Sequence, residues 1–321
     1  MKVSVVIPLY NKKDTIMATL SNVALQLKNG DEVIVIDDGS TDNSGSLVRQ
    51  YIDESGSERV RLYWQENRGV SHARNMGVSL ARNEHVFFLD ADDIWLPGAL
   101  DSIRAMLVHD PSCRMYCLGH IRTADAAGYI ASMHEDNNET LKEVMRTTTY
   151  DGADFISLYA RKNIVHSSAV CVKRNALEDI GGFPEGVKAG EDIYVWLRLS
   201  LAGMTMICAE QLVVVQREPP GNAKKRDAVP YYMKWISSQK DTFRAERRLW
   251  LAIRRFIFYR GMMNCAGRAL AGYRVDVIKR SIEICKIRPL FLPIGLALAL
   301  CPKPIIRIAL KLKMAGSGVS V

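Results

Sequence analysis

Three carboxylates close the apolar segment Phe-Phe-Leu-Asp-Ala-Asp-Asp at residues 87–93. Carboxylates this close together repel one another. A divalent cation that they share with an anionic ligand would relieve this repulsion. The plain alternative is a solvated acidic turn in front of a helix that Pro97 opens. This segment alone leaves both interpretations open.

Two other apolar segments also end in polar residues. One, at residues 3–7, leads into Pro8, Tyr10 and Asn11, and another, at residues 32–36, leads into Asp-Asp-Gly-Ser-Thr-Asp at 37–42. Open α/β sheets bind ligands at the carboxyl ends of their strands. The three segment ends together therefore predict one binding site.

Strand and helix patterns alternate along the first hundred residues. Strands are predicted at 3–7, 32–36, 60–64 and 85–89, and helices after an N-cap at Asp14, around 47–52 and at 70–81. Repeated strand–helix units imply a parallel sheet with helices on both faces. The predicted fold class is thus α/β, of a nucleotide-binding type.

The phosphate-binding motifs of the commonest nucleotide folds are missing. No Gly-x-Gly-x-x-Gly follows the first strand, and no Walker lysine motif occurs. A cation and arginines must then hold any phosphate, and Arg68 and Arg74 are suited to bidentate contact. The alternative for Arg74 is a salt bridge to one of the aspartates.

A second pair of carboxylates precedes an apolar helix. Glu191 and Asp192 follow Gly190 and lead into the bulky segment 193–199. Carboxylates at a helix N-terminus are ordinarily caps. The functional alternative is that one of them is a general base that takes a proton from an incoming hydroxyl.

In this order the segments resemble those of family 2 glycosyltransferases, which have the GT-A fold. The matching pieces span about residues 3–217, and they are segments 3–11, 36–42, 67–69 and 73–77, the motif Asp90-Ala91-Asp92, and segment 181–183 followed by Glu191-Asp192. The resemblance implies a mostly parallel sheet flanked by helices, and the predicted fold class adds a C-terminal basic helical region outside the matching pieces. It also implies Mg²⁺ or Mn²⁺ as cofactor.

The resemblance also implies roles for individual residues. Asp92 would ligate the metal, Asp192 would be the base of an inverting displacement, and Glu191 is the second choice for that base. Asp38 would bind the nucleotide base, Arg74 would lie near the diphosphate, and Asp90 would face the ribose or the sugar. The expected substrate-binding residues are Pro8, Tyr10, Asn11, Asp38, Arg68, Arg74, Asp90 and Ala91.

The implied activity is transfer of a single hexosyl or N-acetylhexosaminyl group from a nucleotide sugar, with UDP expected as the nucleotide. The acceptor would be a glycan or a lipid-linked glycan in surface polysaccharide assembly. The Gln-x-x-Arg-Trp motif of processive synthases is absent. Two other hypotheses stay open: a non-catalytic nucleotide-sugar binding module and a sugar nucleotidyltransferase.

Charge divides the chain into two different parts. Residues 1–216 hold 21 Lys and Arg against 29 Asp and Glu, whereas residues 217–321 hold 22 against 6. No zinc-finger spacing or basic-aromatic RNA motif is present, so an anionic membrane surface is the expected partner and nucleic acid is not. The predicted domains are a catalytic domain at 1–217, a basic helical extension at 218–286 and a membrane-associating tail at 287–321.

The tail contains an apolar run at residues 289–301 that is flanked by cations. At 13 residues it is shorter than the roughly 20 that span a bilayer, which predicts an anchor lying in the interface. The alternative is a buried helix packed on the first domain. Because the first strand begins almost at once and the cysteines form no disulfide framework, the expected location is cytoplasmic, peripheral on the inner face of the cell membrane.

Two further regions remain open. Residues 125–150 lack periodicity and are expected to contribute to the acceptor site, as such a stretch does in the family. His72 is expected to be a packing or surface variant. His166 either borders the acceptor site or is a structural histidine.

Overall fold

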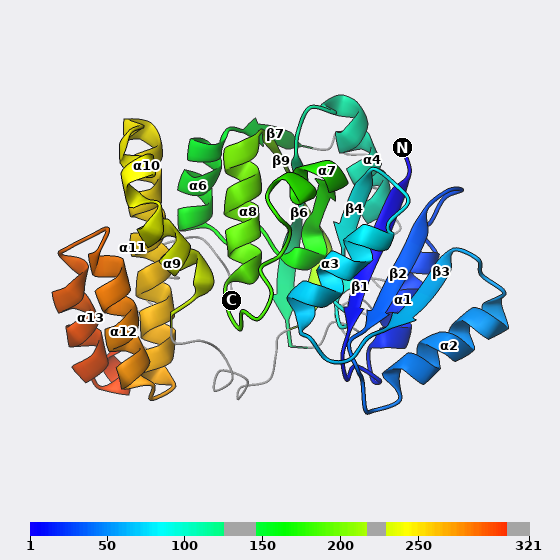
Figure 1. The fold of residues 1–321 in the computed structure, drawn as a ribbon, viewed down its shortest axis with the longest axis horizontal. Coiled ribbons are helices and arrows are strands. Elements are labelled where there is room, and N and C mark those ends of the chain that lie inside the picture. Colours follow the sequence, from blue (N-terminus) through cyan, green and yellow to red (C-terminus); the bar gives the residue numbers. More distant parts are fainter. Residues whose placement is uncertain (125–145, 217–228, 307–321) are drawn as a thin grey trace. The chain divides into compact units, whose positions relative to one another are not determined.

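The computed structural model describes residues 1–124, 146–216 and 229–306 (Figure 1). The predicted acceptor segment at 125–150 therefore lies mostly outside the described residues. Contacts divide the chain into two compact units. The first comprises residues 1–155, 163–187 and 191–224, and the second comprises 156–162, 188–190 and 225–321.

The first unit contains one mixed sheet with the strand order β3-β2-β1-β4-β8-β6-β9-β5, and β7 pairs with β9. The strands are β1 (Val3–Leu9), β2 (Glu32–Asp37), β3 (Val60–Trp64), β4 (His85–Phe88), β5 (Ile94–Trp95), β6 (Met115–Thr123), β7 (Thr147–Tyr150), β8 (Val170–Lys173) and β9 (Thr205–Gln216). Strands β1 to β4 are parallel, whereas β8 is antiparallel to both of its neighbours. The predicted α/β fold class is confirmed.

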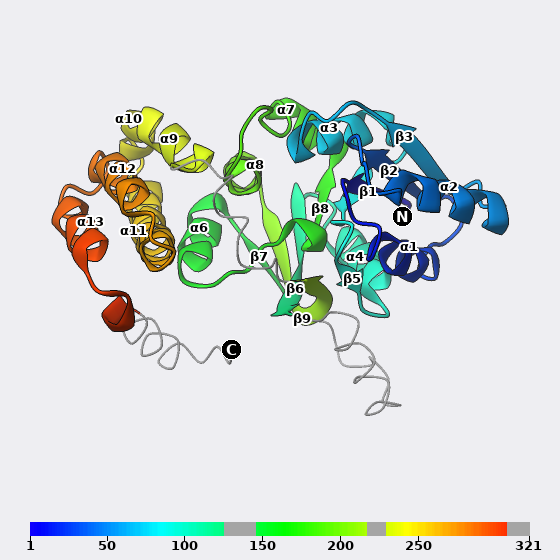
Figure 2. The same cartoon turned by 90° about the horizontal axis from the view of Figure 1, so that it is seen from below.

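Helices cover both faces of this sheet. Figure 2 shows α3, α7 and α8 on one side and α1 and α4 on the other. The helices are α1 (Ile16–Ala24), α2 (Ser44–Ser55), α3 (Val70–Leu80), α4 (Ala99–His109), α7 (Arg174–Asp179) and α8 (Glu191–Ala202), and α6 (Gly152–Arg161) runs from the first unit into the second. Strand β2 is buried along its whole length, as expected for a strand covered on both faces.

The start of α1 differs from the prediction. The N-cap predicted at Asp14 is wrong, because the helix begins at Ile16 and Thr15 is the residue before it. The Thr15 N–H donates to the carbonyl of Lys12 at 3.1 Å, so residues 12–15 form a turn ahead of the helix. This turn places Lys12 close to the acidic loop.

The second unit is helical. Its helices are α9 (Tyr231–Ser238), α10 (Lys240–Arg244), α11 (Arg247–Leu270), α12 (Arg274–Cys285) and α13 (Phe291–Leu300). The apolar run predicted as an anchor forms α13, which packs on α11 and α12 of the same unit: the ring centroids of Phe258 and Phe291 lie 5.9 Å apart. The boundary predicted between residues 286 and 287 thus falls inside this unit. Among the described helices, none has both the length and the apolarity to cross a bilayer.

Candidate active site

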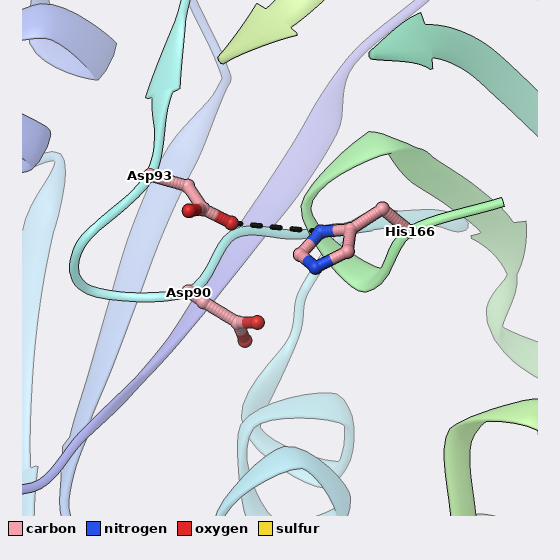
Figure 3. Close-up of side chains that lie close together, drawn as sticks. All are labelled: Asp90, Asp93 and His166. Atoms are coloured by element: carbon pink, nitrogen blue, oxygen red, sulfur yellow. Dashed lines mark ion pairs between the residues drawn. The ribbon is translucent and has the colours of Figure 1, made fainter. Parts of the chain in front are cut away.

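An acidic loop follows β4 and brings Asp90, Asp93 and His166 together (Figure 3). One potential ligand atom from each residue lies within 4.8 Å of the other two. The Asp93 carboxylate is buried, and its Oδ2 lies 3.5 Å from Nδ1 of His166. Two carboxylates and an imidazole form a donor set that suits a divalent cation such as Mn²⁺.

Hydrogen bonds within the loop and to two other segments fix it. The N–H of Asp93 donates to the carbonyl of Asp90 at 3.0 Å, which closes a tight turn. The hydroxyl of Ser168, just before β8, accepts from the N–H of Asp90 at 3.1 Å and donates to Asp93. The N–H of Gln216, at the end of β9, donates to Asp93 Oδ1 at 2.8 Å. The loop itself, the 3-10 turn Ser167–Ala169 before β8 and the end of β9 therefore hold the cluster in place.

Arg74 is the buried cation beside this loop. Its Nη2 donates to Asp90 Oδ1 at 2.7 Å, and its guanidinium carbon lies 5.3 Å from the centre of the Phe183 ring. Burial alone would lower the pKa of Arg74, but the charges of Asp90 and Glu191 raise it. Its Nε and Nη1 are buried and find no hydrogen-bond partner among the described residues. The salt-bridge interpretation of Arg74 thus holds, while its Nε and Nη1 lie below the surface, unpaired within the described part of the chain.

Asp92 lies outside the three-residue cluster. Its carboxylate forms an ion pair with Lys12, which comes from the turn before α1. The sequence assigned the metal to Asp92 and gave Lys12 no role. The sequence did offer a signal for this ion pair. Lys12 follows the first strand closely, and β1 and β4 are neighbours in the sheet, so their ends lie close together.

The carboxylates of the loop carry different charges. Burial raises the pKa of Asp93 to about 8, and the charges of Asp90 and Asp92 act in the same direction. Burial also opposes ionisation of Asp90, but Arg74 and His166 lower its pKa below the ordinary value. Burial lowers the pKa of His166. At neutral pH, Asp90 is therefore ionised, while Asp93 is protonated and His166 is uncharged.

Asp38 holds a neighbouring loop. Its carboxylate accepts hydrogen bonds from Gln65 Nε2 at 2.6 Å, from the N–H of Arg68 at 2.8 Å and from the N–H of Gly69 at 2.9 Å. A carboxylate offers about four acceptor positions, so most of them are used inside the protein. Positioning of this loop is a role for Asp38 that the sequence did not suggest.

The other predicted binding residues lie at the ends of β1 and β4. Pro8 is the partly exposed penultimate residue of β1, and Tyr10 follows with 47% of its surface exposed. Asn11 has a φ of 50° and accepts a 2.8 Å hydrogen bond from the N–H of Thr41. Ala91 is buried, and its carbonyl accepts from Thr15 Oγ1 at 2.9 Å.

Arg68 extends from the loop that Asp38 holds. Its side chain is 58% exposed, and one guanidinium nitrogen lies 3.5 Å from Glu185. The turn that contains Glu185 is fastened to α3 by Asn75, whose Nδ2 donates to the carbonyl of Phe183 and whose Oδ1 accepts from its N–H, both at 2.8 Å. The sequence marked this turn as part of a motif but did not predict that Asn75 anchors it.

Glu191 and Asp192 open α8 as predicted. Asp192 Oδ1 accepts a 2.7 Å hydrogen bond from the N–H of Ile193, which is a capping contact. Burial, reinforced by Asp192, raises the pKa of Glu191 to about 7, although Arg74 opposes this shift. A carboxyl group with a pKa near the working pH is well suited to exchange a proton.

A cavity of about 640 Å³ lies on the α2 side of the sheet. Asp37, Ser40 and Thr41 of the 37–42 segment line it, together with Trp64 and residues of α2. None of the acidic cluster contributes to it. This cavity is therefore separate from the residues that could hold a metal.

Comparison with known proteins identifies the family. The sequence model for "Glycosyl transferase family 2" matches residues 4–166, which is half of the chain. The chain belongs to this family, so the resemblance is confirmed.

Among the relatives, an uncharacterized glycosyltransferase of Escherichia coli, YibD, is 38% identical over 109 residues, which is 34% of this chain and 31% of YibD. The chain thus spans about a third of the length of such relatives. A putative teichuronic acid biosynthesis glycosyltransferase of Bacillus subtilis, TuaG, is 27% identical over 63% of this chain and 73% of its own length.

Solved structures show the same fold. The crystal structure of Staphylococcus aureus TarS in complex with UDP-GlcNAc covers 96% of this chain and 92% of its own chain, with a TM-score of 0.60 and 17% identity. A likeness at this identity establishes the GT-A type of fold and nothing about the ligand.

Proposed function

We propose that this protein transfers a single sugar from a nucleotide sugar to an acceptor hydroxyl with inversion at the anomeric carbon. The observation that carries this proposal is the cluster of Asp90, Asp93 and His166 beside the buried Arg74. A site with a potential divalent cation beside a buried guanidinium group matches the need of a departing diphosphate for positive charge.

The donor and the acceptor are proposed from the relatives. TarS was crystallised with UDP-GlcNAc, which supports a UDP-linked hexosyl or N-acetylhexosaminyl donor. The name of TuaG refers to teichuronic acid biosynthesis, which supports a glycan or lipid-linked acceptor in surface polysaccharide assembly.

The cation that we propose is Mg²⁺ or Mn²⁺. Asp90, Asp93 and His166 would hold it, and Asp92 could join them after release from Lys12. When bound, the cation supplies positive charge that stabilises the leaving diphosphate. The donors that are present fit this group, because carboxylates suit both ions and an imidazole favours Mn²⁺.

The protein's own residues divide the remaining work. Arg74 is fixed by Asp90 and supplies positive charge for the diphosphate. Asp192 is the proposed base for the acceptor hydroxyl, and Glu191 is the alternative. A fall of kcat/KM as the pH drops through 7 would identify Glu191 as the base, because its pKa is about 7.

The first experiment measures donor binding by thermal shift and calorimetry, with UDP-, GDP- and dTDP-sugars and Mn²⁺. Release of the nucleoside diphosphate is then assayed with candidate glycan acceptors. Asp192→Asn should bind the donor normally but stop transfer, and Asp92→Ala and Asp93→Asn should weaken metal-dependent donor binding. Asp101→Asn, on the exposed part of α4, is the matched control and should behave as the wild type.

Three outcomes would overturn the proposal. Full transfer in both the Asp92 and the Asp192 variants would exclude the assigned site. Donor binding without turnover under any condition would indicate a binding module. Release of pyrophosphate from a nucleoside triphosphate would indicate a nucleotidyltransferase.

A further inference from the structure

Helices α12 and α13 of the second unit both expose large apolar side chains. The two helices pack against each other, and both views show them side by side (Figures 1 and 2). The exposed residues, called here the apolar face, are Val275, Ile278 and Ile282 of α12, and Leu290, Leu296 and Leu300 at or in α13. Isolated exposed apolar residues are ordinary, but a set on two adjacent helices indicates an interaction site.

On α12 the exposed apolar residues lie along one side of the helix. Val275, Ile278 and Ile282 have the spacing i, i+3 and i+7, which puts them on one line along the helix. Val277 and Ile284, on another side, are buried. The helix therefore has two apolar sides, and its own unit covers only one of them.

Helix α13 contains no polar side chain in its ten residues, Phe-Leu-Pro-Ile-Gly-Leu-Ala-Leu-Ala-Leu. Phe291, Gly295 and Ala299 are buried, and Gly295 fits closely against Ser281 of α12. Leu300 is nevertheless 76% exposed. A helix that is apolar all round is normally covered all round. The exposed half of α13 therefore requires a partner that the rest of the described chain does not supply.

The charge around the apolar face selects the partner. Lys279 and Lys303 are exposed beside it, and Lys286 is exposed too but pairs with Glu283 at 2.7 Å. From Ile284 to the end, the sequence holds six Lys and Arg and no Asp or Glu. A second copy of the chain, docked by two-fold symmetry, would place these cations against themselves. An anionic surface would neutralise them instead.

We infer that the apolar face of α12 and α13 binds an anionic phospholipid bilayer, with its aliphatic side chains in the interface and its lysines at headgroup phosphates. Helix α13, ten residues long, measures about 15 Å, which is half of the hydrocarbon thickness, so it lies along the surface. This inference concerns the second unit and does not depend on the proposed transfer reaction.

The structure also determines which variants are informative. Deletion of residues 287–321 would remove Phe291 and Gly295 from the contact with α11 and α12, so lost binding could reflect unfolding. Substitution of exposed side chains avoids this difficulty. The test variants of the full chain are Leu296→Ser with Leu300→Ser, and Lys279→Gln with Lys303→Gln.

Binding is measured by co-sedimentation with vesicles of phosphatidylcholine alone or mixed with phosphatidylglycerol. The wild type should bind the mixed vesicles and lose binding as salt rises. The leucine variant should bind at least about tenfold more weakly. The lysine variant should lose about fivefold per cation and only on the anionic vesicles.

A matched control uses exposed apolar residues of the first unit. Leu25 and Val108 are 88% and 68% exposed, and Leu25→Ser with Val108→Ser should leave vesicle binding unchanged. Circular dichroism melting and donor binding should be the same in all variants, which separates this inference from the proposed function. Equal vesicle binding by the wild type and the leucine variant would overturn the membrane inference. Light scattering that shows a dimeric wild type and a monomeric leucine variant would also overturn it.

Discussion

Replacement of Asp93 by Asn should remove a pH dependence of stability in protein kept free of divalent metal by a chelator. Burial raises the pKa of Asp93 in the native state to about 8, whereas its ordinary value is 3.8. Between these two values the native state keeps a proton that the unfolded chain has released. Because the unfolded state then binds fewer protons, the free energy of unfolding falls as the pH rises.

The size of this effect follows from the pKa. One proton is worth about 1.4 kcal/mol per pH unit, so from about pH 5 to about pH 7 the wild type loses about 3 kcal/mol that Asp93→Asn does not lose. The substitution keeps the local contacts. Asn Oδ1 can accept from the N–H of Gln216, as Asp93 Oδ1 does, and Nδ2 can donate to Ser168 Oγ once the Ser168 hydroxyl, which donates to Asp93 in the wild type, turns away.

The assay is urea unfolding followed by circular dichroism at several pH values in that range. The free energies of unfolding of the wild type and Asp93→Asn should be similar at about pH 5, and the variant should be the more stable of the two at about pH 7. Asp101→Asn is the control. The hydrogen bond from Lys28 lowers the pKa of Asp101, so this exposed carboxyl group stays ionised in both states across the range. The difference in the free energy of unfolding between Asp101→Asn and the wild type should therefore be constant. Parallel curves for wild type and Asp93→Asn would show that Asp93 is ionised in the native state, and the reasoning would fail.

The remaining predictions concern three other contacts. Arg74→Met should destabilise the protein by about 1–3 kcal/mol in urea unfolding, because it leaves the Asp90 carboxylate, which is 28% exposed, without its buried cation; a smaller loss than Arg68→Met, whose side chain is exposed, would contradict this. Lys12→Met should tighten Mn²⁺ binding about fivefold in calorimetry without donor, because the ammonium group competes for Asp92; weaker binding would show that Lys12 does not compete. Gly295→Ala should destabilise the second unit by about 1–3 kcal/mol, because an added Cβ collides with α12; Gly267→Ala, on an open side of α11, should be neutral or stabilising, and equal effects of the two would refute the packing argument.

The first half of the sheet could be predicted from the sequence because its strands are covered on both faces. The segment predicted at 32–36 is buried throughout and forms Glu32–Asp37, and the segment predicted at 60–64 is Val60–Trp64. Apolar runs of this length between turn residues indicate buried strands without any knowledge of their partners. The antiparallel strand β8, which separates β4 from β6, left no such signal.

The candidate site could be predicted only where its residues are close in sequence. The acidic loop was recognised from four consecutive residues, and the Arg74–Asp90 pair was considered as an alternative. Ser168 and His166 reach the loop only because β8 lies beside β4, and periodicity does not reveal strand order. The part of the site that the sequence analysis missed therefore comes from residues about eighty positions away from the acidic loop.

Helix α13 shows a similar limit. Its composition indicated an apolar surface, and its flanking cations indicated a membrane, but neither could identify α11 and α12 as the helices that bury one side of it. Phe258 and Gly261 of α11, which contact Phe291, belong to a helix that also carries several arginines. The composition of an apolar segment predicts that it must pack against something. Only the packing shows which part of its surface stays exposed.

Three carboxylates within four residues should repel one another, and the structure resolves this repulsion in three different ways. Asp90 is neutralised by the buried Arg74, Asp92 by the mobile ammonium group of Lys12, and Asp93 by a retained proton. Only the first partner is itself buried and fixed, whereas the ammonium group can move away and the proton can dissociate. A divalent ion that enters the loop can therefore displace Lys12 and the proton while Arg74 stays in place. On this argument metal binding near neutral pH releases about one proton, and calorimetry in buffers of different ionisation enthalpy would detect that release.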